Sequence, residues 1–237
     1  MNRDTITAMG VHQGKVVETR IDGAGRSQVW IACPSAVVPT PGQYVLALSE
    51  NDPEAILPMP LFFQESAEGG FLACPPVPAV WGPGTSLNLR GPLGRGFRLP
   101  PTANRIGLAT LGDSPARLLP LLYQALRRDA AVTLFGGHPL PALPVSVEAY
   151  PLEALPEAVD WADYLAIDLP LPELARLRLQ LGLQGFERLT CPTQVLIETL
   201  MPCSGMADCG ACAVPGRQGW LLACKDGPVF DLDKLDW

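Results

Sequence analysis

Apolar and polar residues alternate in short runs through the first hundred residues, and turn residues separate the runs at fairly even intervals. Such alternation is typical of a strand that buries one of its two faces. The predicted strands span residues 14–21, 27–34, 43–49, 55–64, 69–75 and 85–91. Evenly spaced short strands of this kind predict a small antiparallel barrel or sandwich.

The pattern changes after residue 100. Continuous apolar runs predict buried strands, and longer amphipathic segments between them predict helices. The strands are expected at residues 105–111, 131–137, 163–169 and 193–199, and the helices at 114–128 and 172–182. Ser114 is expected to cap the first helix and Pro172 to open the second. Strands that alternate with helices predict a parallel, Rossmann-like α/β sheet.

The two patterns together predict a multidomain protein of the β plus α/β class. We place an antiparallel β-barrel in residues 1–100 and a domain of the nucleotide-binding type in residues 101–198. A third, small domain is expected in residues 199–237, where cysteines gather.

Composition narrows the classes of function. A chain with 48% hydrophobic and 17% charged residues can bury a sizeable core. The net charge of −7 argues against nucleic acid as a partner, because affinity for phosphates is built from clustered Lys and Arg. The first residues lack the apolar stretch of a secretory signal, and no apolar run approaches the roughly 20 residues of a membrane helix. We therefore expect a cytoplasmic protein that does not enter a membrane.

Four of the seven cysteines lie within one short segment with the spacing C-x5-C-x2-C-x11-C. In a cytoplasmic protein such clustering points to metal and not to disulfides. Ferric iron and sulfide prefer soft thiolate ligands, and glycines at 205 and 210 suit a loop whose N–H groups turn toward the sulfurs. The sequence therefore predicts a [2Fe–2S] cluster, with these ligands: Cys203, Cys209, Cys212 and Cys224.

The same cysteines leave alternatives open. A structural zinc ion also takes four thiolates, but it usually draws them from two C-x2-C pairs, and this segment has one. Plant-type ferredoxin spacing is nearer, although its first gap is four residues and the gap here is five. Disulfides or free thiols are the third alternative. The separate cysteines at 33, 74 and 191 lie in apolar surroundings and are expected to be inert.

Several segments resemble the electron-transfer subunit of type B dihydroorotate dehydrogenase, in the ferredoxin-reductase-like superfamily. They are Cys224–Phe230, Thr193–Glu198 with Met201, Gly84–Phe97 and Pro41–Tyr44. The resemblance implies a flavin-type barrel, a nucleotide-binding α/β domain and a [2Fe–2S] domain whose ligands are the four clustered cysteines. It also implies a catalytic flavoprotein subunit as partner, with electrons passing from that subunit's flavin through the cluster to FAD and then NAD.

The chain departs from the family at its organic cofactor motifs. Met59–Phe62 stands where the family has the flavin signature R-P-x-S, and Thr110–Ser114 stands where it has G-G-G-x-G. Ala166–Pro170 aligns with the family's C-G-P motif but lacks the Cys and the Gly. One glycine does not open a diphosphate loop, and Asp113 would repel phosphate. We expect NAD binding to be weak or absent, and the sequence leaves FAD binding open.

Three hypotheses for function follow from these residues. The first is an electron-transfer subunit that carries a [2Fe–2S] cluster and depends on a partner oxidoreductase for catalysis. The alternative is a zinc-binding, non-redox interaction scaffold that has lost FAD and NAD. An NAD(P)H reductase that acts alone ranks last, since it needs both nucleotide sites.

Overall fold

The computed structural model describes residues 10–22, 25–50, 52, 55–74, 76–137, 143–184, 187, 189–203 and 205–237. Its first part is a closed antiparallel barrel with the strand order β1-β2-β5-β4-β3-β6. The strands are β1 (His12–Ile21), β2 (Ser27–Ala32), β3 (Tyr44–Ser49), β4 (Met59–Ala67), β5 (Gly70–Ala73) and β6 (Ser86–Leu93). The predicted barrel is confirmed, and each of its strands lies within a few residues of the expected position.

Alternation explains how the barrel forms. In β6 the side chains of Leu87 and Leu89 are fully buried, whereas Asn88 between them lies on the outer face. Val29 and Ile31 of β2 point inward in the same way. Because side chains on a strand alternate between faces, this pattern fixes which face closes on the core.

The second part is a sheet with the order β14-β11-β10-β7-β8-β9, and it is parallel except for the antiparallel edge strand β14. The strands are β7 (Arg105–Thr110), β8 (Ala131–Gly136), β9 (Val147–Tyr150), β10 (Tyr164–Pro170), β11 (Thr193–Glu198) and β14 (Val229–Asp231). The four predicted parallel strands are confirmed. The sequence analysis missed β9 and β14, which are short and have little alternation.

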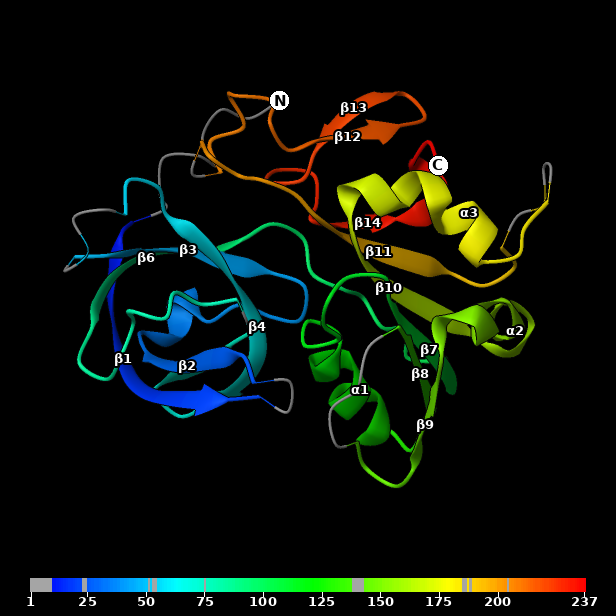
Figure 1. Cartoon of the computed structure of the whole chain (residues 1–237), viewed down its shortest axis with the longest axis horizontal. Coiled ribbons are helices and arrows are strands. Elements are labelled where there is room, and N and C mark those ends of the chain that lie inside the picture. Colours follow the sequence, from blue (N-terminus) through cyan, green and yellow to red (C-terminus); the bar gives the residue numbers. More distant parts are fainter. Residues whose placement is uncertain are drawn as a thin grey trace.

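Helices cover both faces of this sheet. Helix α1 (Leu119–Leu126) lies on the face turned toward the barrel, and α2 (Leu155–Trp161) and α3 (Leu177–Gln180) lie on the other (Figure 1). Helix α3 continues a 3₁₀ segment, Leu171–Arg176, so the helix expected at 172–182 is α-helical only in its last turn. Helix α2 was not predicted.

The expectation that Ser114 caps the first helix is wrong. Helix α1 begins at Leu119 without a side-chain cap, and residues 115–118 form turns in which Pro115 O accepts from the N–H of Leu118 at 2.8 Å. The Ser114 hydroxyl instead accepts a hydrogen bond from Ala116 N at 3.1 Å. Arg117 lies in this turn, and its side chain pairs with Asp168 and Glu198.

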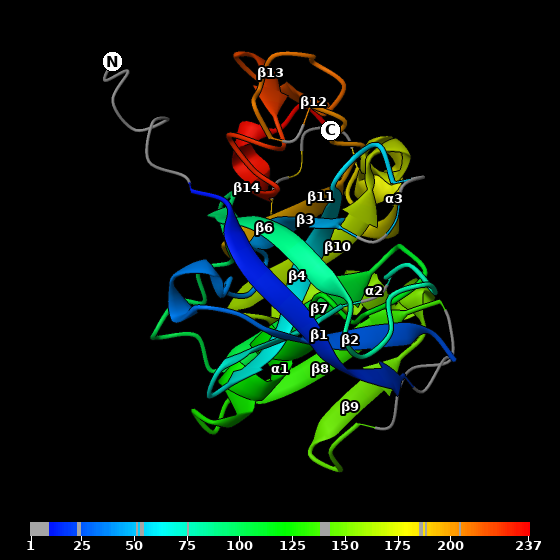
Figure 2. The ribbon, with the colours of Figure 1, turned by 90° about the vertical axis from the view of Figure 1, so that its left-hand side faces the viewer.

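The cysteine-bearing segment forms the hairpin of β12 (Ala213–Gly216) and β13 (Gly219–Leu222) and then returns to the sheet as β14. The hairpin lies above the sheet in Figure 1, and Figure 2 places it at the same end of the molecule, away from α1. No helix in the described ranges is long and apolar enough to cross a membrane.

The barrel and the cysteine-bearing segment touch where two of the resembling motifs meet. Arg95 N donates to Gly227 O at 2.6 Å, and Ile197 N on β11 donates to Pro228 O at 2.9 Å. A Cβ atom added to Gly94 would lie 2.5 Å from Pro228 Cδ, and Gly94 has φ +72°. Only glycine fits this contact between the G-P-L-G and D-G-P segments.

Candidate metal centre

The four predicted ligands lie on one loop and on the turn that follows the β12–β13 hairpin. Cys203, Cys209 and Cys212 are on the loop between β11 and β12, and Cys224 comes directly after β13. Cys212 and Cys224 are buried, Cys203 is half-buried and Cys209 is exposed. The site therefore has a covered side and an open side.

The cysteines act on one another's titration. The Cys209 thiol lowers the pKa of Cys203, and the Cys212 and Cys203 thiols raise the pKa of Cys224. Among the described residues, no group of three or more His, Cys, Asp or Glu side chains is placed so that it could hold a metal ion.

Backbone N–H groups of the loop point toward these sulfurs. Desolvation raises the pKa of the Cys203 thiol, but hydrogen bonds from Asp208 N and the Cys209 thiol, with further N–H donors, lower it to about 6. Ala211 N donates to Cys209 Sγ at 3.5 Å. Gly205 and Gly210 have φ +72° and +70°, as the predicted loop requires. Donors arranged in this way stabilise negative charge on sulfur, which suits thiolates bound to iron.

The buried pair behaves differently. Desolvation raises the pKa of Cys224 to about 12, and its hydrogen bond and charge interaction with Cys212 act in the same direction. Two adjacent buried thiolates repel each other, so a positive ion between them would relieve this cost. The residues present therefore fit a thiolate-bound metal group.

The barrel covers the buried side of the cysteine site. Tyr44 on β3 is fully buried, and its hydroxyl donates to Cys224 O at 3.3 Å. Desolvation, followed by the charges of Cys224 and Cys212, raises the pKa of this hydroxyl far above its usual range. Leu46 and Leu93 approach Gly205 from the same side, each 3.5 Å from where its Cβ would be. Sequence reasoning noted Tyr44 only as part of a motif, and 180 residues separate it from its partner.

A second region is of interest because ligands of open α/β sheets bind at the carboxyl ends of the strands, where the strand order reverses. Here the reversal lies between β7 and β10. Arg117 fills this position. Its Nε donates to Asp168 Oδ2 at 2.8 Å, and its Nη2 donates to Glu198 Oε2 at 2.7 Å. Its guanidinium also lies over the Phe62 ring of the barrel, 5.3 Å from the centroid.

Two of the three charged groups in this crevice are deeply buried, whereas the Glu198 side chain is 47% exposed. The Asp168 side chain is fully buried, and the Arg117 side chain is 9% exposed. Burial raises the pKa of Asp168, against the lowering effect of Arg117. Burial lowers the pKa of Arg117, but Asp168 and Glu198 raise it by more. The Asp168–Arg117–Glu198 cluster joins β10, β11 and the turn before α1 and packs on the barrel. Sequence reasoning named Asp168 only as a departure from a motif and missed Arg117.

Comparison with known proteins places the metal centre in a known domain. Residues 198–236 match the model of the iron–sulfur cluster binding domain of dihydroorotate dehydrogenase B. The chain is 28% identical over 179 residues to the dihydroorotate dehydrogenase B (NAD(+)) electron transfer subunit of Desulforamulus reducens, with 65% of this chain and 67% of that protein covered.

Solved structures show the same fold. The NADH-dependent reduced ferredoxin-NADP oxidoreductase structure has a TM-score of 0.70 at 21% identity, covering 98% of this chain and 91% of that chain. The ferredoxin reductase of carbazole 1,9a-dioxygenase has a TM-score of 0.60 at 19% identity, covering 76% and 67%. These matches confirm the resemblance to the electron-transfer subunits and the ferredoxin-reductase-like fold with an iron–sulfur binding domain.

Proposed function

We propose that this chain is an electron-transfer subunit that carries a [2Fe–2S] cluster on Cys203, Cys209, Cys212 and Cys224 and serves a dihydroorotate dehydrogenase-like flavoprotein. One observation carries the proposal: the loop between β11 and β12 and the turn after β13 carry the four cysteines, and backbone N–H groups of the loop are directed at the sulfurs of Cys203 and Cys209. The match of residues 198–236 to an iron–sulfur binding domain supports the same conclusion.

The cysteine spacing favours a two-iron cluster over zinc. A structural zinc ion usually draws its four thiolates from two C-x2-C pairs, and this segment has one. The loop N–H donors around Cys203 add the electrostatic support that such clusters use.

A bound [2Fe–2S] cluster supplies one-electron transfer. The burial of the cysteines decides from which side a partner protein can exchange electrons with the cluster. Cys212 and Cys224 are buried against the barrel, with Tyr44 beneath them, so water and partners are excluded on that side. Cys209 is exposed. We propose that the catalytic subunit docks on the side of Cys209, where the path from the partner to the site is shortest.

We further propose that the cluster is the only redox cofactor of this chain. The crevice at the switch point of the sheet already holds a paired arginine and two carboxylates, and displacing Arg117 would leave Asp168 buried without its cation. The barrel presents Met59 and Phe62 where the family signature has phosphate-binding side chains, and Phe62 is covered by Arg117. Both features disfavour NAD and FAD.

The test is to purify the chain anaerobically and to measure iron, acid-labile sulfide, zinc and released flavin in one sample. We expect two irons and two sulfides per chain, no flavin, and an electron paramagnetic resonance signal after one-electron reduction. Zinc without sulfide would refute the electron-transfer function and support the interaction scaffold. Stoichiometric FAD beside the cluster would refute only the single-cofactor proposal.

The partner is tested separately. The chain should form a complex with a dihydroorotate dehydrogenase catalytic subunit, and its cluster should be reduced when dihydroorotate is added to that complex. Failure of reduction in a complex that forms, with the cluster present, would contradict the assigned partner but not the cluster.

A further inference from the structure

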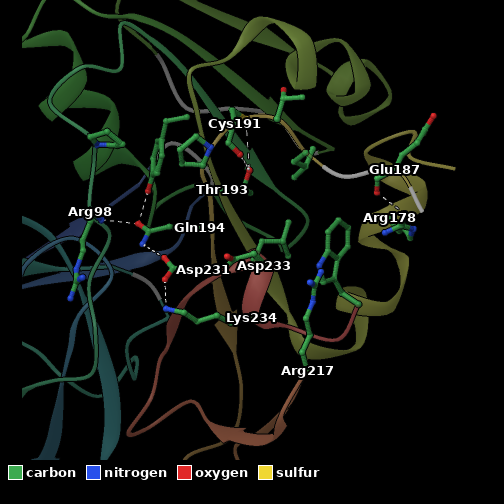
Figure 3. Close-up of a pocket in the computed structure, with 17 residues that line it drawn as sticks. Arg98, Arg178, Glu187, Cys191, Thr193, Gln194, Arg217, Asp231, Asp233 and Lys234 are labelled. Carbon is green, nitrogen blue, oxygen red and sulfur yellow. Dashed lines mark hydrogen bonds and ion pairs between the residues drawn. The ribbon is translucent and has the colours of Figure 1, made fainter. Parts of the chain in front are cut away.

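A cavity of about 690 Å³ opens at the amino ends of β10 and β11, the opposite end of these strands from the Arg117 crevice (Figure 3). Its walls come from the sheet, from α3, from the β12–β13 turn and from the C-terminal segment. The volume lies in the range of small-molecule sites. Neither the cysteine site nor the crevice shares a lining residue with it.

The back wall of the cavity is a fixed hydrogen-bond network around Gln194. Gln194 Oε1 accepts from Tyr164 Oη and from Arg98 N, both at 2.8 Å, and its Nε2 donates to Asp231 Oδ1 at 2.9 Å (Figure 3). Gln194 is 9% exposed and Tyr164 is 1% exposed. A wall with its polar groups satisfied in this way is preorganised, because nothing in it must reorder when a ligand enters.

The charged side chains that line this cavity are four basic ones, Arg98, Arg178, Arg217 and Lys234, and three acidic ones, Glu187, Asp231 and Asp233. Arg217 Nε donates to Leu235 O at 3.3 Å, which orients the guanidinium. Its two terminal nitrogens have no partner within the residues that the structure describes. Arg178 lies over the Trp237 ring, 5.4 Å from the centroid. An oriented guanidinium with free terminal N–H groups is suited to bidentate recognition of a phosphate.

The other groups of the cavity have different chemistry. Asp233 makes no hydrogen bond or ion pair in the described part of the chain, unlike Asp231, which is paired with Lys234. A free carboxylate is an acceptor for the hydroxyls of a ribose, as in dinucleotide sites. Trp237 and Leu189 supply an apolar surface for a flat ring.

From this combination we infer that the cavity binds a nucleoside monophosphate, with its phosphate on Arg217, its ribose hydroxyls on Asp233 and its base against Trp237 and Leu189. The site joins the sheet to the cysteine-bearing segment, because Arg217 and the C-terminal residues belong to that segment. The inference does not depend on which metal group the cysteines hold.

The test is isothermal titration calorimetry of the purified full chain with AMP, UMP, adenosine and inorganic phosphate at one ionic strength. We expect AMP or UMP to bind at least tenfold more tightly than inorganic phosphate or adenosine, because only a nucleotide engages every wall. If neither nucleotide exceeds inorganic phosphate by this factor, the inference is wrong.

Two variants, Arg217→Gln and Asp233→Asn, locate the site, and Arg128→Gln is the charge control for the first. Arg217→Gln should weaken nucleotide binding about tenfold or more, the loss expected for a charge-assisted contact. Arg128→Gln removes the same charge from the exposed end of α1, and should leave the affinity unchanged. Equal losses in the two variants would show that net charge alone attracts the anion, and would overturn the site.

The second variant, Asp233→Asn, changes an exposed residue and should therefore fold. It tests the site even if Arg217→Gln fails to fold. It should weaken AMP about fivefold and leave inorganic phosphate binding unchanged or stronger, since a repelling carboxylate is removed. Stronger AMP binding in this variant would contradict the role assigned to Asp233. Thermal unfolding of each variant confirms that it is folded.

Discussion

The cysteine site and the crevice of the sheet solve opposite electrostatic problems. At the cysteine site, sulfurs that repel one another as thiolates are held together, and backbone donors lower the pKa of Cys203 to about 6. In the crevice, the buried carboxylate of Asp168 and the half-exposed carboxylate of Glu198 are both paired with Arg117. The first region is therefore suited to an added positive group, whereas the second already contains its cation, with Asp168 Oδ1 the one atom of this cluster that is buried without a hydrogen-bond partner among the described residues. The difference teaches that the fold alone does not decide what a site built on it can bind.

The largest expected effect is the loss of bound iron and sulfide at the cysteine site. Cys209→Ser and Cys212→Ser should each reduce bound iron and sulfide to background, because each removes one of the four proposed thiolate ligands. Metal analysis after anaerobic purification measures this, and Cys33→Ser, on the barrel, is the control that should keep full content. Full iron and sulfide in both ligand variants would refute the ligand assignment.

The second effect is a loss of stability when the ion pair between Arg117 and Asp168 in the crevice is removed. Arg117→Met should lower the free energy of unfolding by about 3–5 kcal/mol, because Asp168 is left buried without its cation. Urea unfolding monitored by circular dichroism measures this loss. Arg176→Met, at an exposed pair with Glu173, should change the free energy of unfolding by less than about 1 kcal/mol.

A double variant sharpens the same point. Arg117→Met with Asp168→Leu removes the cation and its buried partner together, so it should recover much of the stability lost in the single variant. If the double variant is as unstable as the sum of the two single variants, the ion pair is not the reason for the loss.

A third, smaller effect concerns the contact beneath the cysteine site. Gly94→Ala should destabilise the fold by about 2–4 kcal/mol, since the new Cβ would meet Pro228 and the residue has positive φ. Gly84→Ala is a matched control, because Gly84 has φ +97° and open space around its Cβ. It should cost about 1 kcal/mol. Equal costs in urea unfolding would show that the approach to Pro228 contributes nothing.

The smallest effect is a dependence on pH at the edge strand β14. Hydrogen bonds from Lys234 and Gln194 lower the pKa of Asp231 below its ordinary 3.8, against some desolvation. A lowered pKa stabilises the folded state above pH 3.8, and this contribution is lost as pH falls through the folded pKa. Asp231→Asn should therefore cost about 0.5 kcal/mol at pH 7 and nothing at pH 2, because the side chain is half exposed. Unfolding of both proteins across this pH range measures the difference, and an equal cost at both ends would contradict it.

Much of the fold can be predicted from local patterns. The alternation along β1 to β6 and the apolar runs of β7, β8, β10 and β11 each lie within one strand, so they can be recognised without knowing which residues meet in space. The cysteine spacing likewise places three of the four predicted ligands on one loop, and the fourth follows the β12–β13 hairpin. Arg117 could not be found in this way, since its partners Asp168 and Glu198 are 51 and 81 residues away. The domain boundaries at residues 100 and 198 remain predictions.

The pairing of β14 with β11 has a consequence for how the metal group is acquired. The chain leaves the sheet at the end of β11, forms the cysteine loop and hairpin, and returns beside the strand it left. The cysteine-bearing segment is therefore a loop whose two ends are both held at strand β11. Such a segment can open as a local unit while the sheet stays folded. We expect the amides of residues 203–212 to exchange hydrogen much faster than those of β11 before metal is added, and the difference to shrink afterwards.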